Sequence, residues 1–187
     1  DRPQRRDGAA AARAHLGVTL FVVEAGRPGF LKAKKLAKMG MAAQDTAELF
    51  FDEMRVPAAN LLGPTEGQGF VQMMQQLPQE RLVVAVAAAA AMERAVELAV
   101  AYAKDRTAFG KPLMEQQNTR FVLAECAGTV RAGRTLLDDA ISRHLRGELD
   151  VAPAAMIKFW LTDAQCRVVD ACLQIFGGYG YTMEYPI

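Results

Sequence analysis

The spacing of hydrophobic residues divides the chain into a short β-rich part and a longer helical part. Residues 16–24 are rich in β-branched and aromatic side chains and are followed by a turn of glycine and proline, which predicts a strand. Further strands are predicted for residues 31–38 and 46–56, the latter ended by Pro57. From about residue 64 onward, alanine, leucine and glutamate recur every three to four positions, which is typical of helices.

The helical part predicts an antiparallel bundle. Proline fits the first turn of a helix but not its interior, so a short helix over residues 67–76 should end before Pro78, and a second helix should run from there to about residue 104. After a loop over residues 106–113, two more helices are predicted, over residues 115–146 and 152–176. Long helices with short connections are typical of an up-down bundle.

These elements predict a mainly α protein in three parts. Residues 1–15 receive no assignment, residues 16–63 form a partial antiparallel β-domain, and residues 64–187 form a four-helix-bundle-type domain whose fourth helix is missing. The chain starts without methionine and stops shortly after the third long helix. We therefore expect it to be a segment of a longer protein.

Composition and charge exclude several classes of function. The 22 basic and 21 acidic residues give a net charge of +1, which does not favour nucleic acid as a partner. The longest apolar run, residues 82–92, is shorter than the roughly 20 residues of a membrane span. The three cysteines form no Cys-x-x-Cys pair and lie far in sequence from both histidines, so we expect no metal site and no disulfide framework.

Four short motifs occur in one order along the chain. They are Phe50-Phe51-Asp52-Glu53-Met54-Arg55-Val56-Pro57 ahead of Gly67-Gln68-Gly69-Phe70; Leu77-Pro78-Gln79-Glu80-Arg81; Arg106-Thr107-Ala108-Phe109-Gly110-Lys111-Pro112-Leu113 with Gln117; and Gln174-Ile175-Phe176-Gly177-Gly178-Tyr179-Gly180-Tyr181. In these motifs and their spacing, residues 17–187 resemble the acyl-CoA dehydrogenases, most closely the long-chain type. The resemblance implies part of the middle β-domain and most of the C-terminal helical domain of a flavoprotein. It also implies a homotetramer that holds FAD across subunit contacts.

Glu80 is the predicted catalytic residue. In long-chain and isovaleryl-type members, the glutamate at this position of the motif is the base that removes the α-proton of the acyl thioester; most other members carry the base near the C-terminus, beyond residue 187. Such a weakly acidic proton requires a positioned base. Without the resemblance, a carboxylate two residues after Pro78 would be read as a first-turn acid favoured by the helix dipole.

The resemblance also assigns binding residues, each of which has an ordinary structural alternative. Arg81 would contact substrate, or be a solvated helix cation. Arg106 would bind the pyrophosphate of a neighbouring subunit's FAD, or complement the end of a helix. The remaining predicted cofactor contacts are Phe109, Gln117, Gln174, Gly177 and Gly178. Their ordinary alternatives are a buried ring for Phe109, a helix-surface amide for Gln117 and a helix cap for residues 174–178.

The resemblance implies an FAD-dependent dehydrogenase that forms an α,β double bond in a fatty acyl-CoA, with long chains favoured, and passes electrons to an electron-transfer flavoprotein. An acyl-CoA oxidase of the same fold and a non-catalytic helical scaffold for oligomerisation are the alternatives. We expect a protein that is not secreted, located in a bacterial cytoplasm or a mitochondrial matrix. Residues 1–187 alone should be inactive, because the domains that hold the flavin ring are absent.

Overall fold

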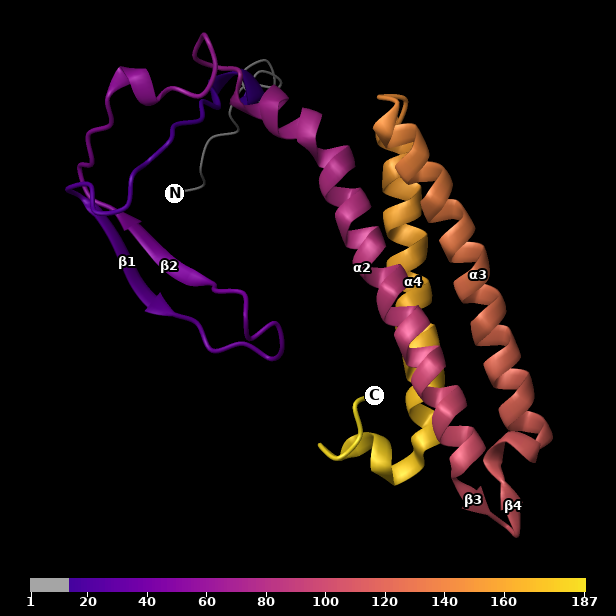
Figure 1. Ribbon diagram of the computed structural model, residues 1–187. Helices are drawn as coiled ribbons and strands as arrows, with labels where there is room; N and C mark the ends of the chain where they lie inside the picture. The colour runs from indigo at the N-terminus through magenta and orange to yellow at the C-terminus, as the bar shows by residue number, and fades with distance from the viewer. Residues whose placement is uncertain (1–13) are drawn as a thin grey trace, which may run out of the picture. The chain divides into compact units, whose positions relative to one another are not determined.

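The computed structural model describes residues 14–187, drawn in Figure 1. The chain divides into two compact units, one extending to Met74 and the other comprising Gln75–Ile187. Within the described residues, no helix combines the length and apolar character needed to cross a lipid bilayer.

The first unit contains a small antiparallel sheet. Strand β1 (Phe30–Lys35) pairs with β2 (Ala47–Phe51), with Phe30 opposite Phe51 and an irregularity in the register before Lys35. The two phenylalanine rings stack with centroids 5.2 Å apart. Short 3-10 turns lie on either side, η1 (Ala14–Gly17) and η2 (Ala58–Asn60). The predicted strands over residues 31–38 and 46–56 are thus present in shortened form.

The predicted strand over residues 16–24 is wrong. This segment is extended, but its backbone bonds go to an irregular loop: the Val22 N–H donates to the Asn60 carbonyl, and the Leu62 N–H donates to the Leu20 carbonyl, both at 2.9 Å. A β-strand requires a neighbouring strand with a continuous hydrogen-bond ladder. The local residue pattern predicted the extended conformation but could not supply that neighbour.

The predicted break before Pro78 is also wrong. Helix α2 (Gly69–Asp105) runs through the proline without interruption. An interior proline removes one backbone hydrogen bond and costs about 3 kcal/mol, but strong helix formers flank it on both sides, and the later turns of α2 are anchored in a core. Glu80 is therefore the twelfth residue from the start of α2 rather than a first-turn acid. The helix dipole favours carboxylates only within the first turn of a helix. It therefore does not explain why an acidic residue occupies position 80.

The second unit is a bundle in which the later part of α2 lies beside α3 (Gln117–Leu145) and α4 (Val151–Phe176), as Figure 1 shows. A hairpin and a 3-10 turn connect α2 to α3; they are β3 (Thr107–Ala108), β4 (Lys111–Pro112) and η3 (Leu113–Glu115). Another 3-10 turn, η4 (Gly177–Tyr181), follows α4. The two predicted helices over residues 115–146 and 152–176 are confirmed.

Small side chains bring the three helices together. The fully or nearly fully buried residues of α2 are mostly alanines at helical spacing, which allow neighbouring backbones to approach. They pack against larger residues that recur on the inner faces of all three helices, including Met92, Leu137, Leu161 and Phe176. Arg134 on α3 adds a two-pronged ion pair to Glu93 on α2, at 2.6 and 2.7 Å, which lowers the pKa of the Glu93 carboxyl.

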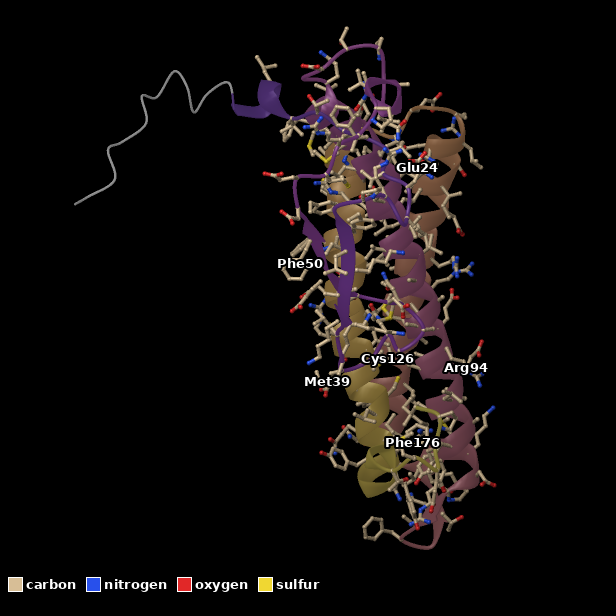
Figure 2. The ribbon with its side chains drawn as sticks, turned by 90° about the vertical axis from the view of Figure 1, so that its left-hand side faces the viewer. Glu24, Met39, Phe50, Arg94, Cys126 and Phe176 are labelled. Carbon is tan, nitrogen blue, oxygen red and sulfur yellow. The ribbon has the colours of Figure 1, made fainter. Side chains whose placement is uncertain are left out.

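Two of the three free cysteines face each other in this core. Cys126 on α3 and Cys172 on α4 are buried and their thiols interact, whereas Cys166 is exposed; Figure 2 shows Cys126 partway along the bundle. Burial raises the pKa of both buried thiols, and that of Cys172 goes from its usual 9.0 to about 12. Both groups therefore remain neutral at physiological pH.

The contrast between the exposed Cys166 and the two buried cysteines predicts selective thiol labelling. At pH 8 about one Cys172 thiol in 10⁴ is ionised, given its pKa of about 12, and only the thiolate reacts with iodoacetamide. Peptide mapping of the native protein should therefore find label on Cys166 and only traces on Cys126 and Cys172. All three should be labelled in denaturant, which is the control. Rapid native labelling of Cys172 would contradict the buried arrangement.

Candidate cofactor-binding and catalytic sites

A hollow of about 480 Å³ lies at the end of the bundle that holds Phe176, near the bottom of Figure 2. It is formed by the end of α2, the start of η3, the end of α4, and η4. Three predicted cofactor residues line it together, namely Arg106, Gly177 and Gly178. Residues more than 70 positions apart in sequence thus meet at one surface.

Arg106 presents a cation to this hollow from a fixed backbone. Its N–H donates to the Tyr102 carbonyl, and its own carbonyl accepts from the Leu113 N–H, each at 2.8 Å. Its guanidinium lies over the Tyr179 ring, with Cζ 5.5 Å from the ring centroid. Across residues 14–187, no carboxylate forms an ion pair with Arg106. Its N–H groups are therefore available to an anion from outside this chain.

The two glycines differ in what they require. Gly177 has φ of +58° and ends α4, with its N–H bonded to the Gln174 carbonyl, so here glycine serves the helix cap. Within the described part of this chain, nothing requires a glycine at position 178, because a Cβ there would meet no other atom within 4 Å. Its missing side chain leaves backbone open for a ligand to approach closely. Gln174 is exposed on the last turn of α4.

Phe109 occupies the tip of the β3–β4 hairpin. Phe109 and Gly110 have φ of +55° and +80°, the arrangement of a type I′ turn, in which a bulky residue at the first position is strained. The phenylalanine side chain is 95% exposed, so the alternative of a buried loop residue does not hold within this chain. An exposed apolar ring in a strained turn is suited to a contact beyond its own chain. Gln117, the first residue of α3, is also exposed.

Glu80 and Arg81 lie far from this hollow. Glu80 is exposed on α2 and lines a separate shallow hollow of about 380 Å³ with Gln76, Gln79 and Val83, while Arg81 is half-buried. Arg106 directly follows the last residue of α2 and comes 26 positions after Glu80, so that at 1.5 Å per helical residue the two lie about 39 Å apart. A single chain therefore does not bring the predicted base and the predicted cofactor residues together.

The aromatic residues around Arg106 received no predicted role from the sequence, although Phe176 and Tyr179 belong to its fourth motif. Tyr102, on the helical turn before Arg106, stacks on Phe176 with centroids 4.2 Å apart, and Tyr185 packs edge-on against both rings. Tyr179 in turn packs against Tyr185 at 5.2 Å. One signal was available, since three of the four tyrosines of the chain lie within residues 179–185.

Comparison with known proteins gives one consistent result. The family described as acyl-CoA dehydrogenase, C-terminal domain, matches residues 67–187. The mitochondrial long-chain specific acyl-CoA dehydrogenase of Rattus norvegicus is 46% identical over 178 residues, which cover 95% of this chain and 41% of that protein. The short-chain specific acyl-CoA dehydrogenase of Megasphaera elsdenii is 42% identical over 171 residues, which cover 91% and 44%.

Comparison with solved structures leads to the same family. A crystal structure of an acyl-CoA dehydrogenase from Geobacillus kaustophilus superposes with a TM-score of 0.91 at 47% identity, covering 97% of this chain and 47% of that one. The butyryl-CoA dehydrogenase of Megasphaera elsdenii superposes with a TM-score of 0.88 at 40% identity, covering 94% and 45%. The chain thus spans less than half the length of these relatives.

Proposed function

Because the chain belongs to the acyl-CoA dehydrogenase family, we propose that the protein is an FAD-dependent enzyme that introduces an α,β double bond into fatty acyl-CoA thioesters. The observation that carries this proposal is the convergence of Arg106, Gly177 and Gly178 on one hollow. A guanidinium without an acidic partner in the described chain, beside backbone that no side chain covers, suits a diphosphate.

These residues would hold the ADP portion of FAD. Arg106 would bind the pyrophosphate through its N–H groups, and the backbone of Gly177 and Gly178 would approach the same group. The other predicted contacts are exposed but do not line this hollow, and they would reach parts of the cofactor beyond it; they are Phe109, Gln117 and Gln174. When bound, FAD supplies the redox chemistry by accepting a hydride from the β-carbon of the acyl chain. The chain's own contribution at this end is to bind and orient the cofactor.

Glu80 would supply the acid–base chemistry. A carboxylate oxygen of Glu80 would take the α-proton of the thioester while the hydride leaves the β-carbon, so that the substrate loses one proton and one hydride and gains one C=C bond. Its surroundings, Gln76, Gln79 and Val83, are uncharged. Arg81, the next residue, would contact the substrate.

The separation between the two sites supports an assembly of several chains. Since the length of α2 separates Glu80 from Arg106 by about 39 Å, Arg106 would serve the FAD of a neighbouring subunit, as in a homotetramer. Large apolar side chains on the outer faces of all three helices agree with further packing against other parts of the assembly. Examples are Val83, Phe121 and Phe159, which are 62%, 64% and 69% exposed.

Long-chain substrates and an electron-transfer flavoprotein as acceptor complete the proposal. The identity to a mitochondrial long-chain enzyme supports the first, although a butyryl-CoA dehydrogenase is also a structural neighbour. A solved structure described as the electron transferring flavoprotein of Acidaminococcus fermentans, to which this chain is similar, supports the second. An oxidase is the alternative of the same fold, and a non-catalytic scaffold is the alternative of another class.

One anaerobic experiment separates these possibilities. Adding palmitoyl-CoA to the complete protein loaded with FAD should bleach the flavin absorbance, and electron-transfer flavoprotein should restore it faster than oxygen does. Butyryl-CoA is the control for chain length and should bleach the flavin more slowly. Restoration by oxygen alone would favour the oxidase, and a complete protein that binds no FAD would favour the scaffold.

A further inference from the structure

Arg106 is the predicted cofactor residue whose charged group lies over an aromatic ring. The Tyr179 ring beneath it belongs to a connected aromatic cluster formed by Tyr102, Phe176, Tyr179 and Tyr185, with neighbouring centroids 4.2 to 5.9 Å apart. Tyr102 lies on α2, Phe176 is the last residue of α4, and the two other tyrosines come after α4 in the chain. The cluster therefore joins the two helix ends that line the hollow.

The backbone holds Tyr179 in place from both sides. A Cβ on Gly180 would lie 2.8 Å from Leu173 Cδ1 and 3.0 Å from the Leu173 carbonyl, so η4 packs directly onto the last turns of α4. The Tyr179 carbonyl accepts bonds from both the N–H and the hydroxyl of Thr182, at 3.1 and 2.9 Å. The ring that meets Arg106 is therefore carried on a fixed segment.

Arg106, by contrast, is held by backbone bonds but ends in a long and flexible side chain. The contact with Tyr179 attracts the guanidinium charge to the ring without a hydrogen-bond acceptor, whereas a diphosphate binds through hydrogen bonds from the guanidinium N–H groups. The two interactions are therefore compatible on one side chain. The cation–π contact with Tyr179 restricts the guanidinium to fewer positions, which lowers the entropy lost when an anion binds.

We propose that Tyr179 is a positioning residue that aligns the Arg106 guanidinium for the diphosphate of FAD. This inference rests on the proposed role of Arg106 in cofactor binding. It assigns Tyr179 a function that does not require contact with the cofactor, and it makes the aromatic ring, rather than the phenol hydroxyl, the functional group.

A double-mutant cycle on the complete protein tests this coupling, with the dissociation constant of FAD measured from the fluorescence of the released flavin. Tyr179→Leu should weaken FAD binding about fivefold, which corresponds to about 1 kcal/mol for one cation–π contact. Arg106→Ala alone should weaken FAD binding at least tenfold. In that background, Tyr179→Leu should change the dissociation constant of FAD by less than twofold.

Matched variants separate positioning from a structural role. Tyr179→Phe and Tyr179→Trp keep the ring and should bind FAD within twofold of wild type or more tightly. Tyr181→Leu changes a tyrosine of the same turn that is 95% exposed, and it should leave FAD binding unchanged. Weakening by Tyr179→Leu to the same degree in both backgrounds, or by Tyr179→Phe as much as by Tyr179→Leu, would overturn the inference.

The same data distinguish the inference from the proposed function. If Arg106→Ala binds FAD like wild type, the cofactor role of Arg106 is lost and the inference goes with it. If Arg106→Ala weakens binding while Tyr179→Leu does not, the cofactor role stands and only the positioning role of Tyr179 is rejected.

Discussion

Replacing Glu80 with glutamine in the complete protein should leave FAD bound and lower the rate of acyl-CoA dehydrogenation by about 10²- to 10⁴-fold. The range reflects what a positioned general base contributes to proton transfer. Glutamine has the shape of glutamate but cannot accept the α-proton, so the loss should fall on the chemical step. Flavin content and the single-turnover rate of flavin reduction by palmitoyl-CoA measure the two effects separately.

Glu97→Gln is the matched control for this change. Glu97 is an exposed carboxylate of the same helix, paired to Arg94 at 3.2 Å and outside the hollow that contains Glu80. Its loss should leave turnover within twofold of wild type, because an exposed pair contributes little to stability. Wild-type turnover by Glu80→Gln would move the base to a residue outside this chain.

Gly133→Ala should destabilise the bundle by about 1–3 kcal/mol. Gly133 on α3 is buried where three helices meet, and an added Cβ would lie 2.7 Å from Leu161 Cδ2, 3.2 Å from Trp160 Cζ3 and 3.6 Å from Met92 Cε. Since Leu161 is fully buried, it has no free space into which to move. The thermal unfolding midpoint of the complete protein should therefore fall.

Two variants show whether this steric contact is the cause. Gly128→Ala on the same helix adds a Cβ that meets nothing within 4 Å, so it should be neutral or stabilise α3 by about 0.5–1 kcal/mol. Leu161→Ala removes the closest clashing group and costs about 2–5 kcal/mol itself, but in that background Gly133→Ala should cost less than in wild type, since only the 3.2 Å approach to Trp160 remains tight. Equal midpoints for Gly133→Ala and Gly128→Ala would contradict the packing described for α3.

The elements that the sequence predicted well are those whose signal is local. Helices α3 and α4 follow from apolar side chains at three- and four-residue spacing and from the glycines at 147 and 177, both with positive φ. The two errors arose where a local rule met a longer-range effect. Pro78 lies inside α2 because surrounding residues and distant packing outweigh one lost hydrogen bond, and residues 16–24 lack the partner strand that their composition favours.

For the candidate site, too, local features were predictable from the sequence and spatial relationships were not. The sequence by itself determined the family motifs, and with them Glu80 and Arg106, because the identity and spacing of neighbouring residues are properties of the chain alone. Only the tertiary structure decided that Arg106 meets Tyr179 and two glycines while Glu80 lies about 39 Å away. The physical reason is that α3 and α4 reverse the chain twice, which brings residue 179 back to residue 106, whereas the length of α2 keeps residue 80 away from residue 106.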